Sequence, residues 1–206
     1  MKNIGIIILA AGESRRMGRP KQLLPIKGQP LLLHVVEEAL SSPVSHVMVV
    51  LGSNHQSHSE LLETYPVHLV NNPDWKNGIG SSIRRGVEEM ITRVKGLDAI
   101  LIMVGDQPAI RFEYLSHMIN IYQQTSSLAI ASGYAGTYGV PALFDKSLFD
   151  ELLNLGDDQG AKAILSSRRN EILVLDCPEG ELDLDTPEDV VRFQEEYIHK
   201  NVRSTS

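Results

Sequence analysis

A short stretch near the N-terminus gathers four cationic side chains around two glycines, directly after an apolar run. The cations are Arg15, Arg16, Arg19 and Lys21. Residues 6–9 are apolar and mostly β-branched, as in a strand covered on both faces, and Gly12 and Gly18 free the backbone to turn N–H groups toward an anion. Arginine and lysine suit phosphate oxygens. The stretch therefore predicts a phosphate-binding loop that could hold a triphosphate.

The spacing of this loop excludes two common nucleotide motifs. It matches neither the P-loop pattern G-x-x-x-x-G-K-[ST] nor the dinucleotide pattern G-x-G-x-x-G. Two of the seven histidines, His55 and His58, have helical spacing, but they have no evident third ligand or carboxylate partner, and we expect the histidines at the surface. The chain has no G-x-S-x-G elbow, which argues against a nucleophilic hydrolase.

Asp106 is the first candidate metal ligand. It follows the apolar run 100–104 and lies between Gly105 and Pro108, so a carboxylate is presented on a stiff turn at the end of a buried strand. Mg²⁺ prefers one or two carboxylates together with water and phosphate oxygens, which a nucleotide supplies. The alternative is that Asp106 is only a turn residue or the cap of the following helix.

The acidic segment 181–189 offers a second carboxylate. If the segment is extended, alternation places Asp183 and Asp185 on one side of it. Thr186 as N-cap and Pro187 at the first position predict that a helix begins here, with acidic residues in its first turn. The alternative is that the acids only belong to a solvated loop and a helix start.

A third segment, residues 72–84, combines turn formers with two hydroxyls at a helix start. Backbone groups and the side chains of Ser81 and Ser82 could read the edge of a planar base there. Trp75 in the same segment either stacks on a ligand or anchors packing.

The stretch L-A-A-G-E-S-R-R-M-G-R-P-K, residues 9–21, resembles the signature of nucleotidyltransferases that move a nucleoside monophosphate from a triphosphate onto a phosphate. It is most similar to the signature of the molybdenum cofactor cytidylyltransferases and their relatives. The resemblance runs in motif order from residue 6 to about residue 189. It implies a three-layer α/β/α Rossmann-like nucleotidyltransferase fold with a mainly parallel mixed sheet.

The resemblance also implies roles for individual residues. The catalytic residues would be Arg16, Lys21 and Asp106, and Mg²⁺ would be held by Asp106 and Asp185, with Asp183 as the weaker choice. The nucleotide would contact Leu9, Ala10, Ala11, Gly12, Ser14, Arg16, Lys21, Gly78, Ser82 and Asp106. The acceptor would contact Gly139, Pro141 and Lys162. Arg15 falls on a variable position, and Val140 stands where relatives often have His, which puts a polar contact there in doubt.

The implied reaction is attack of an acceptor phosphate on the α-phosphate of the nucleotide, with release of pyrophosphate. Ala10-Ala11-Gly12 resembles the cytidylyl branch, which favours CTP over GTP. The implied acceptor is molybdopterin carrying molybdenum, and a molybdenum hydroxylase is the implied client. Two alternatives stay open: a sugar or polyol phosphate as acceptor, and a non-catalytic escort that binds the cofactor for a molybdenum enzyme.

The net charge, the cysteine count and the length of the apolar runs argue against several other classes of protein. A net charge of −7 over 206 residues argues against a nucleic-acid partner, which would require a basic face. A single cysteine, Cys177, permits no disulfide within the chain and fits the cytoplasm. No apolar run reaches the ~20 residues of a membrane span.

The elements that must position these residues follow the pattern of βα units. We expect strands at residues 4–9, 46–51, 67–70, 99–104, 128–131 and 172–175, with helices between them. In the helix after Gly80, the core face is Ile83, Val87, Met90, Ile91 and Val94. We expect one nucleotidyltransferase domain over residues 1–200 and a disordered tail at 201–206.

Overall fold

The computed structural model describes residues 1–14, 17, 20–26, 28–184 and 186–193. Its centre is a sheet in the order β5-β4-β1-β6-β8-β7-β9. The strands are β1 (Ile4–Ala10), β4 (His46–Leu51), β5 (His68–Asn71), β6 (Ala99–Val104), β7 (Ala129–Tyr134), β8 (Thr137–Asp145) and β9 (Ile172–Asp176), and β2 (Pro25–Ile26) and β3 (Gln29–Pro30) form a small separate sheet. All neighbours in the large sheet are parallel except the two pairings of β8. The sheet is therefore mixed and mainly parallel, as expected.

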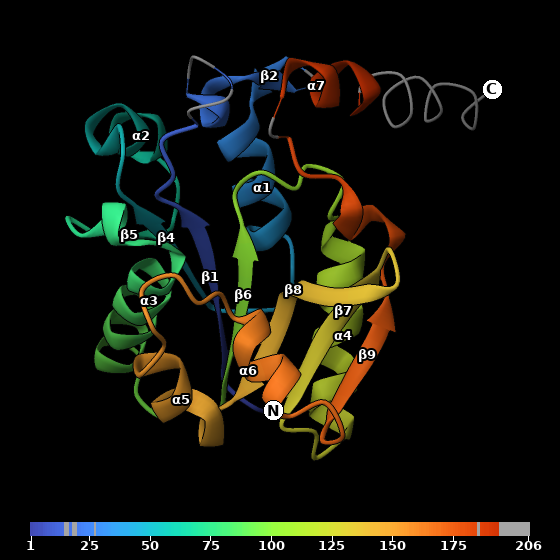
Figure 1. Ribbon diagram of the computed structural model, residues 1–206. Coiled ribbons are helices and arrows are strands. Elements are labelled where there is room, and N and C mark those ends of the chain that lie inside the picture. The colour runs from blue at the N-terminus through green and yellow to red at the C-terminus, as the bar shows by residue number, and fades with distance from the viewer. Residues whose placement is uncertain (15–16, 18–19, 27, 185, 194–206) are drawn as a thin grey trace.

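Helices cover both faces of this sheet (Figure 1). The α-helices are α1 (Leu31–Leu40), α2 (His55–Leu62), α3 (Ile79–Arg93), α4 (Phe112–Gln124), α5 (Phe149–Leu153), α6 (Lys162–Ser167) and α7 (Pro187–Phe193). Short 3-10 helices lie at η2 (Lys21–Leu23), η3 (Trp75–Asn77), η4 (Lys146–Leu148) and η5 (Pro178–Glu181).

The alternation of β1 side chains divides the apolar core into two layers. Ile6 and Ile8 pack with α1 and α4 on one face. Ile7 and Leu9 pack with α3, α5 and α6 on the other. A strand buried on both faces reads as one continuous apolar run, which is why the first strand could be recognised in the sequence. The three-layer α/β/α fold is confirmed.

Strand β8 is absent from the sequence prediction, which placed no strand between residues 131 and 172. The strand contains Gly139 and Pro141, and both residue types weaken the strand signal. It nevertheless pairs with β6 on one side and β7 on the other. The turn before it, Ala135-Gly136, has φ values of 48° and 70°, the left-handed pair of a two-residue hairpin.

Two helix predictions are confirmed, and the surface prediction is wrong for two histidines, His34, which is 4% exposed, and His58. Ile83, Val87 and Met90 are fully buried on α3. At α7, Thr186 Oγ1 accepts from Asp189 N at 3.3 Å while an Asp189 carboxylate oxygen accepts from Thr186 N at 2.8 Å. His58, expected at the surface, is 0% exposed because it lies with Leu62 on the buried stripe of the otherwise polar α2.

The described residues contain no helix long and apolar enough to cross a membrane. Residues 201–206, expected to be a disordered tail, lie outside the described part of the chain.

Candidate active site

The carboxyl ends of β1 and β6 lie side by side, because these parallel strands pair Leu9 with Val104. Both point to the upper edge of the sheet in Figure 1. A cavity of about 230 Å³ opens there. It is lined by Leu9, Ala10, Ala11, Gly12, Lys21, Gln22, Trp75, Gly78, Ile79, Ser82, Val104, Gly105 and Asp106. This is the edge at which open α/β sheets bind ligands.

Lys21 and Asp106 form an ion pair at the wall of this cavity, although 85 positions separate them in the sequence. Their side chains are 12% and 20% exposed, so solvent screens the pair only in part. The second carboxylate oxygen of Asp106, Oδ1, is buried and has no hydrogen-bond partner among the described residues. One oxygen of Asp106 is thus balanced by a cation, and the other is left for a ligand.

Ser14 shapes the loop that carries Lys21. Its Oγ accepts from the Lys21 backbone N–H at 3.1 Å and donates to Gln22 Oε1 at 3.2 Å. Ser14, with φ of 58°, adopts a left-handed conformation, whereas Gly12, expected to free the backbone, has no positive φ. Ser14, predicted to contact the nucleotide, does not line the cavity, and its contacts are within the loop. Arg16, like Arg15, Gly18 and Arg19, lies outside the described residues.

Three contacts fix the turn that presents Asp106. Gly105 N donates to Leu9 O at 2.9 Å, and His34 Nε2 lies 2.9 Å from Pro108 O. Leu184 N donates to Asp106 O at 3.0 Å, so the acidic segment crosses the turn. The next helix, α4, begins only at Phe112, so Asp106 is not its cap.

The donor set at Asp106 fits a divalent cation that shares its coordination with phosphate. The buried Oδ1 lacks a partner within the described residues, and Mg²⁺ accepts one or two carboxylates when phosphate oxygens supply the rest. Within the described ranges, no group of three or more His, Cys, Asp or Glu side chains could hold a metal ion alone. Asp185 lies outside the described residues, and Asp183 is exposed.

The opposite wall of the cavity comes from η3 and the start of α3. Asn72 is buried and donates to Ser81 Oγ at 2.9 Å and Ser82 Oγ at 3.0 Å. Gly78 and Ser82, which are predicted to contact the nucleotide, line the cavity, whereas Ser81 is bound to the loop backbone. Trp75 lines the cavity and also packs over Gly52, so it serves as packing anchor and cavity wall together.

A second cavity, of about 170 Å³, adjoins the first, and both are lined by Leu9, Ile79 and Val104. Gly139, Val140, Lys162 and Tyr134 line this second cavity. Lys162 Nζ donates to Thr137 Oγ1 at 2.7 Å. Burial and the charge of Asp183 raise the pKa of Tyr134.

Pro141 is the one predicted acceptor residue that the structure places away from these cavities. It is buried within β8, and its carbonyl accepts a hydrogen bond from Ser132 Oγ at 2.6 Å. Sequence reasoning in turn missed Gln22 and Tyr134. Gln22 follows Lys21 in the signature and could have been included, whereas Tyr134 belongs to a hairpin that the sequence did not reveal.

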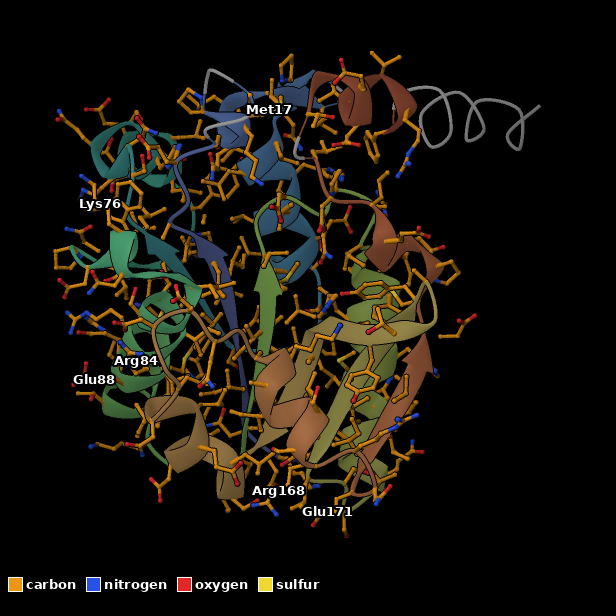
Figure 2. All side chains as sticks on the ribbon, viewed as in Figure 1. Met17, Lys76, Arg84, Glu88, Arg168 and Glu171 are labelled. Atoms are coloured by element: carbon orange, nitrogen blue, oxygen red, sulfur yellow. The ribbon has the colours of Figure 1, made fainter. Side chains whose placement is uncertain are left out.

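The loop between α5 and α6 is held against the start of α3. Gly80 N donates to Asp157 O at 2.8 Å. Arg84 on α3, labelled in Figure 2, donates to the Leu155 carbonyl and pairs with the Asp157 carboxylate. The same loop supplies Gly160 and Ala161 to the second cavity, next to Lys162 at the start of α6, so the two cavities share a common support.

Comparison with known proteins gives the family. Residues 6–172 match the MobA-like NTP transferase domain. The purine catabolism protein PucB of Bacillus subtilis is 33% identical over 90% of this chain and 94% of its own length. Nicotine blue oxidoreductase of Paenarthrobacter nicotinovorans is 30% identical over 91% and 94%. The molybdenum cofactor cytidylyltransferase of Escherichia coli is 24% identical over 96% and 98%.

Solved structures share the fold. The crystal structure of Rv0371c from Mycobacterium tuberculosis superposes with a TM-score of 0.81 at 27% identity, covering 95% of this chain and 99% of that one. A complex of the same protein with manganese has a TM-score of 0.77 at 26% identity, covering 95% and 100%. From the family match over most of its length, the chain belongs to the MobA-like NTP transferase domain family and is a nucleotidyltransferase of that family.

Proposed function

We propose that the protein transfers CMP from CTP to the terminal phosphate of the molybdenum–molybdopterin cofactor and releases pyrophosphate. The observation that carries the proposal is the Lys21–Asp106 pair in a cavity that adjoins a second cavity with Lys162 at its wall. The first cavity has the loop and carboxylate of a triphosphate site. The second has room and one cation for an acceptor phosphate.

The bond changes are those of an in-line substitution at phosphorus. An oxygen of the acceptor phosphate attacks the α-phosphorus, and the bond from that phosphorus to the β-phosphate oxygen breaks. The electron pair of this bond leaves with pyrophosphate. Such transfers depend on positioning and on neutralising charge, and the protein forms no covalent bond.

The chain's own residues supply this positioning. Lys21, with Arg16 as the second proposed cation, neutralises the triphosphate, and Lys162 holds the acceptor phosphate. Asp106 and Asp185 would hold Mg²⁺, which when bound would neutralise charge on phosphate oxygens. The manganese complex of the related Rv0371c makes Mn²⁺ the first alternative metal to test.

Cytosine is favoured by the Ala10-Ala11-Gly12 sequence at the cavity wall. The molybdopterin acceptor is supported by the relative named molybdenum cofactor cytidylyltransferase. A molybdenum hydroxylase is the client that would receive the product. The same reaction with a sugar or polyol phosphate, or with GTP, uses the same residues and differs only in the occupants of the two cavities.

The deciding experiment supplies the purified protein with Mg²⁺, each of four nucleoside triphosphates and a panel of acceptors: the molybdenum-loaded pterin, the metal-free pterin and sugar phosphates. Pyrophosphate is measured and the products are weighed by mass spectrometry. We expect pyrophosphate and a cytidylylated pterin only with CTP and the loaded pterin. Detection of a nucleotidylated sugar phosphate would show that the acceptor is a sugar phosphate and not the pterin.

A cofactor-binding escort is the second candidate function. The relatives at 33% and 30% identity have names that denote neither a nucleotidyl transfer nor an escort, so this alternative from the sequence is kept. An escort would bind CTP or the pterin without Mg²⁺-dependent release of pyrophosphate. The same experiment separates the two functions.

A further inference from the structure

Gln107 lines neither cavity. It lies where the acidic C-terminal segment meets the turn of Asp106. It is 2% exposed, and its Nε2 donates to the carbonyl of Gly180 at 3.0 Å. One residue earlier, Asp106 O accepts from Leu184 N at 3.0 Å. Two adjacent residues of the turn therefore bind two points of the same incoming segment.

The far side of that segment is fixed by β7. Cys177 N donates to Gly133 O at 2.8 Å. Gly180 lies so close to the ring of Tyr134 that a Cβ at this position would be 2.6 Å from the ring carbon Cδ1. Gly180 is thus held between Tyr134 and Gln107, and the chain runs from there through Leu184 into Asp185.

We propose that Gln107 is a positioning residue that holds the acidic segment, through Gly180, against the turn of Asp106, so that the Asp106 carboxylate keeps its orientation before a metal binds. The inference rests on the proposed metal–nucleotide site. Glu181 and Asp183 of this segment carry the same charge as Asp106, and a neutral amide can hold the two stretches of chain together without adding charge. Gln107 lines neither cavity, so it acts through Gly180 and not by touching substrate.

The other amide atom of Gln107 shows that stability alone does not explain this side chain. Its Oε1 is buried and has no hydrogen-bond partner among the described residues. A buried acceptor without a partner lowers the stability of the fold, and an apolar side chain of the same length would remove that cost. Stability and metal binding should therefore respond differently to replacement of Gln107.

The experiment uses Trp75, the single tryptophan of the chain, which lines the nucleotide cavity. Its fluorescence reports CTP binding without any acceptor. CTP is titrated without divalent ions, and Mg²⁺ or Mn²⁺ is then titrated at fixed CTP. The proteins are the parent, Gln107→Met, and Tyr122→Phe as control, because Tyr122 loses buried hydrogen bonds to Asp98 O and Asp145 far from the site.

For Gln107→Met we expect unchanged CTP affinity without metal and an increase of about tenfold or more in the metal concentration for half-maximal response, the scale seen when groups that orient metal ligands are removed. Tyr122→Phe should lose thermal stability and keep the parent metal response. Parent-like metal dependence in Gln107→Met overturns the positioning role, and so does an equal loss of CTP affinity with and without metal.

A second variant keeps the test decisive if Gln107→Met does not fold. Gly180→Ala places a methyl against Tyr134 and displaces the same segment, so we expect the same metal-selective defect, and a parent-like metal response in this variant overturns the inference. If the parent itself shows no metal-dependent CTP response, the proposed metal–nucleotide function fails, an outcome distinct from a variant that behaves like its parent.

Discussion

The ion pair between Lys21 and Asp106 concentrates the chemistry of the site in two side chains. Each lies on an element fixed by backbone hydrogen bonds, η2 for Lys21 and the Gly105–Pro108 turn for Asp106. Asp106 has one oxygen paired with the lysine and one without a partner among the described residues. When a nucleotide binds, Lys21 must leave the Asp106 carboxylate or share it with the ligand. The ion pair between the two side chains is then replaced by contacts to the ligand.

Removing either charge should abolish most of the turnover. For Lys21→Ala and Asp106→Asn we expect pyrophosphate release to fall by about two to three orders of magnitude, the scale on which single groups stabilise a developing charge. Circular dichroism should stay unchanged, because neither side chain belongs to the apolar core. Near-parent turnover in both variants would contradict the assignment.

Lys162→Ala should instead raise the KM for the acceptor, because Lys162 is proposed to hold the acceptor phosphate.

At the scale of elements, the junction between α3 and the loop from α5 to α6 joins the two cavities. Gly80 is the point of closest approach: a Cβ there would lie 2.0 Å from the carbonyl oxygen of Gly156 and 2.9 Å from that of Asp157. Both obstacles are backbone atoms, which cannot rotate away as a side chain can. The second residue of α3 is therefore a glycine for packing and not for conformational freedom.

Gly80→Ala tests this junction because the two relevant effects have opposite signs. In an exposed helix, alanine would stabilise by about 1 kcal/mol relative to glycine. The clash should dominate, and we expect a loss of about 1–3 kcal/mol in the free energy of unfolding in urea. Gly160→Ala on the facing loop is the control, since its nearest neighbour would be Ile79 Cγ2 at 3.8 Å. A gain of stability in Gly80→Ala would contradict this account.

Sequence reasoning succeeded where local pattern and tertiary packing agree. The buried parallel strands β1, β4 and β6 are continuous apolar runs, and the core face of α3 follows helical spacing. The meeting of Lys21 and Asp106 follows from strand ends that share one edge. Strand β8 was missed although its partner β7 directly precedes it, because Gly139 and Pro141 within it argue for a turn.

At the scale of the whole molecule, α2 buries a group that lowers the stability of the fold in acid. His58 is fully buried, and neither of its ring nitrogens has a hydrogen-bond partner among the described residues. Burial, and secondly the nearby His55, lower the pKa of His58 below its ordinary value of 6.5. The folded protein therefore keeps this imidazole neutral at a pH where the unfolded chain would bind a proton.

This difference predicts acid sensitivity. As the pH falls below about 6.5, the unfolded state binds a proton that the folded state does not, so the free energy of unfolding decreases until the lowered pKa is passed. The slope from one proton is at most about 1.4 kcal/mol per pH unit. We expect His58→Leu to narrow the difference between urea midpoints at pH 7.5 and pH 5. His117→Leu, at an exposed position of α4, should leave that difference unchanged, and an unchanged difference in His58→Leu would refute the explanation.

Because β8 runs against its neighbours, its amino end and the Ala135-Gly136 turn arrive at the edge where β1 and β6 finish. One wall of the second cavity is thus built from this hairpin, through Tyr134, Gly139 and Val140, and the facing wall from α3 and the parallel half of the sheet. Insertions in the tip would reshape one wall and leave the other intact. Substitution of a few residues in this hairpin would therefore change the shape of the acceptor cavity and leave the nucleotide cavity unchanged.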